Sequence, residues 1–131
     1  MVAYSFKRRF ADPIRAKLKR HTMRNDRKRH ARVGERIQLY VSQRHPTGYK
    51  LGDATCTGVL RLRLLFDERR VEFESGHAIT TPDDTDAFAV GDGFSSWADM
   101  EAFWRVEHPD VRAWSGVMIQ WGYSFEPVVV R

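Results

Sequence analysis

FKRRFADPIRAKLKRHTMRNDRKR, residues 6–29, is the stretch that decides how this 131-residue chain is organised. It contains eleven lysines and arginines but only two aspartates. Phe6, Phe10, Ile14 and Leu18 recur at spacings of four, which indicates one stripe of a helix or of a turn followed by a helix. The stretch is therefore predicted to be both folded and strongly cationic. An anionic ligand would relieve the repulsion among its charges, and a solvated basic face without a ligand is the alternative.

The charge of the chain is divided unevenly along its length. Residues 1–36 carry 13 Lys and Arg against 3 Asp and Glu, a net charge of +10, whereas residues 37–131 carry 9 against 14, a net charge of −5. A basic first third on a mildly acidic body is typical of a protein with one face that meets phosphate. The apolar runs are too short for a bilayer span or a signal peptide, so we expect a cytoplasmic protein with no membrane partner.

Strand patterns dominate the rest of the chain. Val2–Phe6 and Arg36–Val41 alternate between apolar and polar residues, and Tyr49–Phe66 is a long β-like run with Gly52 and Gly58 as bend points. A meander that bends at glycines indicates a small barrel. Further strands are predicted at the following places: Thr22–Arg24, Arg70–Glu74, Val117–Trp121 and Phe125–Val130.

Three helices are predicted beside these strands. Asp12 is expected to cap a helix that runs to about Lys19, and Thr81 and Ser96 are expected to cap two more. The second helix should end near Gly91. The predicted fold class is therefore α+β: one domain over residues 1–131, a small mixed or antiparallel β-barrel with two to three flanking helices.

Two short motifs are candidates for chemistry. In Lys19-x-x-Thr22, the threonine hydroxyl is a weak nucleophile that needs a base, and the flanking cations would lower the pKa of Lys19 toward that role. Asp92, in a Gly-Asp-Gly connection, would serve as general acid or base if the fold brings it to the basic stretch. The plainer interpretations are that Lys-x-x-Thr arises by chance in a basic chain and that Gly-Asp-Gly is only a tight turn.

Other residues of the basic stretch are candidates for a nucleic-acid interface. Unpaired bases stack on aromatic rings, and Tyr40 is the predicted ring near Lys19 and Thr22. The histidines and the single cysteine lack metal-ligand spacing, and the chain lacks a glycine-rich phosphate loop, so neither a metal nor a cofactor is expected. The predicted phosphate contacts are Arg9, Lys17, Arg24, Arg27, Lys28 and Arg29.

Several segments, in conserved order and spacing, resemble one known family. They are Arg9-Phe10, then Ile14, then Lys19-x-x-Thr22-x-Arg24, followed by Gly34-Glu35-Arg36-Ile37 and by Asp92-Gly93-Phe94 before a helix with Trp97 and Phe103. Together they resemble the ASCH domain family, whose members are relatives of the PUA domains. The resemblance spans most of the chain.

The resemblance implies a PUA-like β-barrel with a cleft lined by the signature residues, and RNA as the partner. Some bacterial members are amidohydrolases that act on N4-acetylcytidine through Lys, Thr and Glu, which correspond to Lys19, Thr22 and Asp92; RNA cleavage is another activity in the family. Two departures matter. Lys17 replaces the signature glycine, and Asp92 is one methylene shorter than the family's glutamate, which displaces a proton donor.

Both departures disfavour the deacetylase activity, and the added charge of Lys17 favours binding of a nucleic acid. The first hypothesis is a module that binds RNA, another nucleic acid or a nucleotide in a basic cleft. The second is a hydrolase that acts on N4-acetylcytidine-type nucleosides or on RNA. A protein-interaction domain that uses the acidic body is a third. The sequence indicates no oligomeric state.

Overall fold

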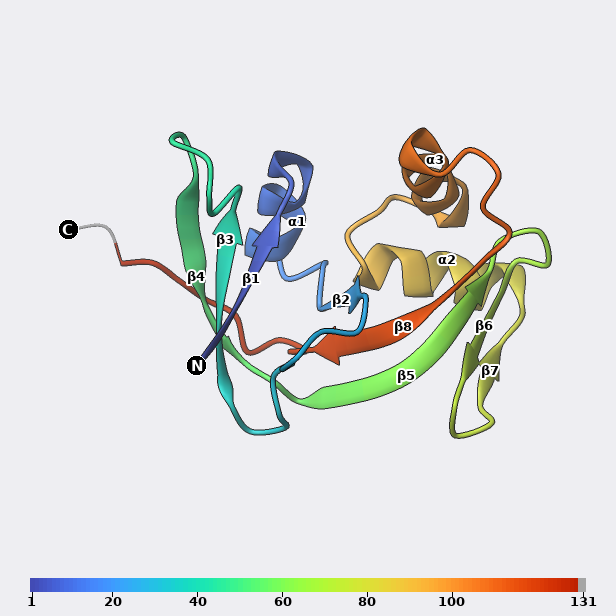
Figure 1. Cartoon of the computed structure of the whole chain (residues 1–131), viewed down its shortest axis with the longest axis horizontal. Helices are drawn as coiled ribbons and strands as arrows, with labels where there is room; N and C mark the ends of the chain where they lie inside the picture. Colours follow the sequence, from blue (N-terminus) through green and yellow to red (C-terminus); the bar gives the residue numbers. More distant parts are fainter. Residues whose placement is uncertain (130–131) are drawn as a thin grey trace.

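The computed structural model describes residues 1–129, and these residues form an α+β fold with two β-sheets (Figure 1). Sheet A is mixed, because its first two strands are parallel and the other neighbours are antiparallel. In spatial order, sheet A consists of β1 (Val2–Phe6), β3 (Arg36–Val41), β4 (Tyr49–Thr55) and β9 (Glu126–Pro127). The predicted strands Val2–Phe6 and Arg36–Val41 are confirmed.

Sheet B is antiparallel throughout. In spatial order it consists of β2 (His21–Arg24), β8 (Ala113–Gln120), β5 (Gly58–Leu65), β6 (Arg70–Phe73) and β7 (Ala78–Ile79). The predicted strand at Phe125–Val130 is represented by the short β9, and Val130 lies outside the described residues. Likewise, the predicted single domain extends to Arg131, which also lies outside them.

The closed barrel is not confirmed, since the strands of residues 1–129 belong to two separate sheets. The reason lies in the run Tyr49–Phe66, which is two strands and not one. Between them, the backbone N–H of Cys56 donates to Glu35 O beside sheet A, and the next N–H, of Thr57, donates to Gln120 O in sheet B. Two residues therefore move the chain from one sheet to the other, a change that alternation alone does not reveal.

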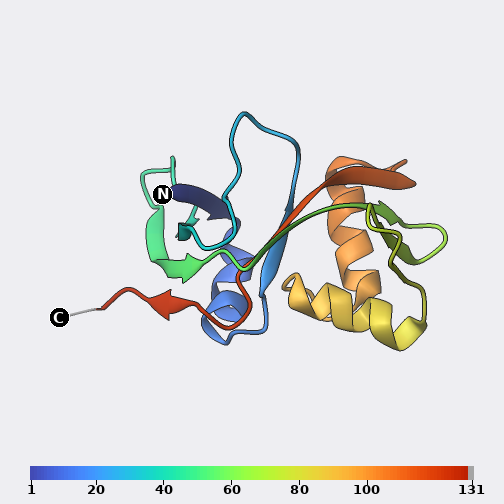
Figure 2. The same cartoon turned by 90° about the horizontal axis from the view of Figure 1, so that it is seen from below.

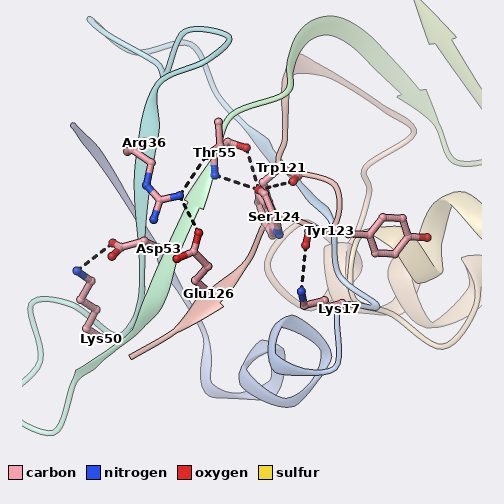
Figure 3. A network of polar contacts seen from close by, with 9 residues as sticks. All are labelled: Lys17, Arg36, Lys50, Asp53, Thr55, Trp121, Tyr123, Ser124 and Glu126. Atoms are coloured by element: carbon pink, nitrogen blue, oxygen red, sulfur yellow. Dashed lines mark hydrogen bonds and ion pairs between the residues drawn. The ribbon is translucent and has the colours of Figure 1, made fainter. Parts of the chain in front are cut away.

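The chain after β8 returns to sheet A through a polar network (Figure 3). Ser124 Oγ donates to Trp121 O at 2.6 Å and accepts from Thr55 N at 3.0 Å. Arg36 Nη1 donates to Thr55 Oγ1 at 3.1 Å and to Glu126 at 3.3 Å. These bonds hold the returning segment against β3 and β4, where β9 pairs.

Two of the helices begin as predicted. In α2 (Pro82–Gly91), Thr81 Oγ1 accepts from the N–H of Asp84 at 3.2 Å, and in α3 (Trp97–Glu107), Ser96 Oγ accepts from the N–H of Asp99 at 3.1 Å. Such caps satisfy N–H groups that have no partner in the helix. Figures 1 and 2 show that α2 and α3 lie together on one side of sheet B. No helix of the described residues is long and apolar enough to cross a membrane.

The helix predicted from Asp12 to about Lys19 is wrong in length and in its cap. A 3-10 turn at Arg8–Phe10 leads into α1, which spans only Ala11–Arg15, and no side chain caps it. The chain leaves the helix because Lys17 adopts a left-handed conformation, with φ of 61°. Phe6, Phe10 and Ile14 of the predicted stripe are buried, but Leu18, beyond the turn, is exposed.

We expect Lys17→Gly to raise the free energy of unfolding by about 0.5–1 kcal/mol. A side chain at positive φ clashes with its own backbone, and glycine removes that clash at a smaller cost in unfolded-chain entropy. Lys17 Nζ also donates to Tyr123 O at 3.1 Å (Figure 3), so Lys17→Ala is the matched control, because it loses this contact and keeps the Cβ. Urea denaturation of both variants measures the difference, and equal stabilities would exclude strain at this position.

Candidate functional site

A pocket of about 220 Å³ lies where an edge of each sheet meets the other. β1 is an edge strand of sheet A and β2 an edge strand of sheet B, and both contribute to the wall. The α2–α3 connection and α3 supply the remaining sides. The lining residues are Ser5, Phe6, Lys7, Phe10, Lys19, Thr22, Met23, Arg24, Asp92, Phe94, Phe103 and Trp104.

Lys19 is the buried charge of this pocket, with 2% of its surface exposed. Its ammonium donates to Asp92 Oδ1 at 3.0 Å, to Asp92 O at 2.5 Å and to His21 O at 2.9 Å. An ammonium has three donors, so all of them have partners. The Nζ atom also lies 4.8 Å from the ring centre of Phe10 and 5.4 Å from that of Phe6, within the range of cation–π attraction.

Burial lowers the pKa of Lys19, because removal from water disfavours the charged form, and the adjacent Asp92 carboxylate opposes the shift. Arg24 and Arg9 add to the lowering through their positive charge. The sequence predicted a lowered pKa from flanking cations; the structure has the same direction, but burial is the larger cause.

The Asp92 carboxylate is positioned by the end of α2. Gly93 has φ of 97°, its N–H donates to Val90 O at 2.9 Å, and the N–H of Phe94 donates to Ala89 O at 3.0 Å. This pair of bonds is the Schellman motif that ends many helices. It turns the chain so that Asp92 and Phe94 both line the pocket, and the carbonyl at the negative end of the helix receives the Lys19 ammonium.

His21 is a second neighbour of the same carboxylate. Its Nδ1 is 3.4 Å from Asp92 Oδ1, and it has no hydrogen-bond partner among the described residues. The ring packs against Phe88 at an interplanar angle of 32°, with centroids 5.0 Å apart. One carboxylate oxygen therefore faces both Lys19 and His21.

Thr22 and Arg24 project from β2 into the pocket. Arg24 Nε donates to Thr22 Oγ1 at 3.2 Å, and Arg24 Nη2 donates to the edge carbonyl of Ser5 at 2.7 Å. The guanidinium thus links the two sheet edges, and burial lowers its pKa. Among residues 1–129, the Thr22 hydroxyl accepts a hydrogen bond from Arg24 but donates none. No protein acceptor therefore orients its hydrogen.

Aromatic rings form the opposite wall. Phe10, Phe94 and Phe103 contact one another with ring centroids 5.2–5.5 Å apart, and Trp104 extends the wall along α3. Phe103 and Trp104 of α3 were not among the predicted site residues, yet they are only half-buried and line the pocket. Lys7 was also missed; it pairs with Glu107 at 3.0 Å and lies over Phe103.

Of the six predicted phosphate contacts, only Arg24 lines the pocket. Arg27 does not line it, but its guanidinium lies 4.6 Å from the ring centre of Tyr4, the ring that Arg24 also contacts. Arg9 lines a different hollow, where it pairs with Asp99 at 2.8 Å and its guanidinium lies 4.9 Å from the ring centre of Phe94. The N–H of Ser95 and the Arg9 guanidinium hold the pKa of Asp99 below its usual range.

The other predicted binding residues lie away from the pocket. Arg29 pairs with Glu35, Lys17 contacts Tyr123 O, and Lys28 is exposed without an ion pair within residues 1–129. Tyr40 lies on β3 between two buried residues and is itself half-buried. It does not line the pocket. The structure therefore brings together Lys19, Thr22, Asp92 and Arg24, but not Lys17, Lys28, Arg29 or Tyr40.

No group of three or more His, Cys, Asp or Glu side chains suitable for a metal ion occurs among residues 1–129. The pocket contains a single carboxylate, Asp92, and that carboxylate is engaged by Lys19. The hydrogen-bond donors of the pocket and its one carboxylate are suited to an organic ligand with hydrogen-bonding edges.

Comparisons with known proteins found no counterpart: no family description, no curated protein and no solved structure matches this chain.

Proposed function

We propose that the chain is an ASCH-like, PUA-like module that binds RNA, or a nucleotide with RNA-like chemistry, through the pocket at the Lys19–Asp92 corner. A nucleobase would enter between the aromatic wall and β2. Thr22 would donate to an acceptor on the base, Asp92 would accept from an exocyclic amine, and Arg24 and Arg27 would meet phosphate. A cytoplasmic location belongs to the same proposal.

The observation that carries the proposal is the chemistry of one small hollow. It combines a hydroxyl without an acceptor, a guanidinium, a carboxylate and four phenylalanine rings. Its volume of about 220 Å³ is below the range of about 300–1,000 Å³ usual for drug-sized ligands, so a single base is a better match than a large cofactor. Aromatic rings next to arginines are the usual platform for unpaired bases.

Arg24→Gln is expected to weaken binding of a short single-stranded RNA about tenfold to a hundredfold, the value of one hydrogen bond to a charged group. The substitution should also reduce the slope of log K against log salt concentration by about 1, the value for loss of one phosphate contact. Fluorescence anisotropy at several salt concentrations measures both quantities. Arg63→Gln, an exposed arginine that pairs with Glu72 and does not line this pocket, is the matched control and should change neither.

Because Arg24 also links the two sheets, Arg27→Gln supplies an independent variant. Arg27 is exposed, so its loss should leave the fold intact and still reduce the salt slope. Wild-type affinity that is insensitive to salt would contradict the proposal, since phosphate contacts must release counterions.

A hydrolase is the second candidate, favoured by one observation: Lys19, Thr22 and Asp92 line the same pocket, and burial lowers the pKa of Lys19. The substrate would be an N4-acetylcytidine-type nucleoside or RNA. Lys19 would act as base toward Thr22 or water, and Asp92 as proton donor. The three bonds of the ammonium oppose this role, because Lys19 must lose a proton and release an acceptor to act as a base.

If the pocket is catalytic, Thr22→Val should reduce turnover of N4-acetylcytidine by about 10²–10⁴-fold, the usual contribution of a positioned proton-transfer partner. Turnover should rise with pH through the lowered pKa of Lys19 and remain high above it, because the neutral amine is the active form. Liquid chromatography of released acetate and cytidine is the measurement. If neither the acetylated nucleoside nor a short RNA is turned over by the wild type, the catalytic candidate is rejected and the binding module stands.

A further inference from the structure

The pocket does not end at Trp104. A second hollow of about 260 Å³ shares Met23, Arg24 and Trp104 with it, and a third of about 490 Å³ shares Trp104, His108 and Trp114 with the second. Shared lining residues make the three hollows neighbours, and Trp104 lines all three. The residues around the two added hollows come from β2, α3, β8 and the segments that follow β2 and α3. We call these three hollows the groove.

Two indole rings occupy the middle of the groove. Trp104 and Trp114 have centroids 5.1 Å apart, and both are only half-buried. Trp114 Nε1 donates to Asn25 Oδ1 at 2.9 Å, which fixes the orientation of its ring. His108 lies beside Trp104 with centroids 6.5 Å apart. Large rings that are held in place and partly open to solvent are suited to stacking with a planar ligand.

The charges divide along the groove. Arg24 lies at the junction of the first two hollows, and Arg27 is close by in sequence on the exposed segment that follows β2. At the outer end, Glu107 is paired with Lys7, whereas Asp110 is exposed. A phosphate chain is therefore favoured along the β2 side and disfavoured at Asp110, so the outer hollow is suited to a base and not to a phosphate.

We propose that the ligand of this site is a single-stranded oligonucleotide whose neighbouring bases stack on Trp104 and Trp114, and not a free nucleoside. This inference rests on the proposed function, because the first base occupies the pocket at Lys19. Aromatic rings in a basic groove are the means by which proteins bind unpaired strands with little sequence preference. RNA and DNA share this chemistry, and only contacts to the 2′-hydroxyl would distinguish them.

The test is a titration of wild-type protein and of Trp114→Ala with four probes: cytidine 5′-monophosphate, a tetraribonucleotide, the matching tetradeoxyribonucleotide and a tetramer of equal charge that has a base only at one end. The complete tetranucleotide should bind at least about tenfold more tightly than the tetramer with one base. Trp114→Ala should lose about tenfold in affinity for the complete tetranucleotide, the range expected for one stacked base, and nothing for the monophosphate. The ribo and deoxyribo forms indicate which of the two strands the groove prefers.

Two further variants keep the result interpretable. Trp114→Phe retains a ring and should retain most of the affinity even if Trp114→Ala is unstable, and Tyr123→Ala removes an exposed ring on another part of the surface and should have no effect. Equal affinity for the complete tetranucleotide and the tetramer with one base would overturn the inference and leave the proposed function intact. Absence of binding to all four probes would overturn both.

Discussion

Asp92→Ala should lower the free energy of unfolding by about 3–5 kcal/mol, the usual loss when one partner of a buried ion pair is removed. The Lys19 ammonium would remain buried with two carbonyl acceptors and without its counter-charge. Differential scanning fluorimetry and urea denaturation measure the loss. Asp26→Ala is the matched control, because the Asp26–Arg61 pair is well exposed and its loss should change the free energy of unfolding far less.

A double-mutant cycle distinguishes loss of the pair from loss of packing. Lys19→Met should also be strongly destabilising, since it leaves the carboxylate buried and unpaired. The double variant Lys19→Met/Asp92→Ala should be much more stable than the sum of the single losses predicts, with a coupling of about 2 kcal/mol or more. Strict additivity would mean that the two groups do not interact in the folded protein, against the 3.0 Å contact between them.

Gly93→Ala should cost about 2–4 kcal/mol and also abolish ligand binding. Position 93 requires positive φ, and an added Cβ would lie 2.8 Å from Lys19 Cδ and 2.9 Å from Phe10 Cδ1. The backbone strain contributes about 1 kcal/mol and the overpacking about 1–3 kcal/mol. Because Lys19 and Phe10 both line the pocket, the clash displaces two of its walls.

Gly76→Ala separates these two contributions. Gly76 has φ of 98°, nearly equal to that of Gly93, but an added Cβ would meet nothing within 4 Å. It should lose only the strain, about 1 kcal/mol, and bind ligand normally. Similar losses at both glycines would show that the close approach to Lys19 has no energetic consequence.

Local signals in the sequence predicted the elements well and their assembly poorly. Hydroxyl caps at Thr81 and Ser96, and the alternation in Arg36–Val41, depend on neighbours a few residues away, and the structure confirms them. The helix end at Lys17 was missed, because a lysine at positive φ leaves no compositional signal of the kind that glycine would. The separation into two sheets depends on hydrogen bonds between distant segments, such as Thr57 N to Gln120 O.

The sequence predicted the polar residues of the candidate site but not the aromatic residues that surround them. Lys19, Thr22 and Asp92 were singled out from short motifs and a family resemblance, and the fold brings them to one pocket. Trp104 and Trp114 are far from that motif in sequence and become neighbours only because α3 packs beside β8. Tyr40 was chosen because it lies in a predicted strand that could flank the basic stretch, but strand alternation places it on the face of sheet A opposite the core.

The most direct test of the central claim is a map of amide chemical shifts of ¹⁵N-labelled protein during titration with cytidine 5′-monophosphate. The largest changes are expected to cluster at Ser5, Thr22, Arg24, Gly93 and Phe94, around the Lys19–Asp92 corner. Changes confined to another surface, such as the hollow beside Arg61 and Glu74 on sheet B, or no changes at millimolar nucleotide, would contradict it.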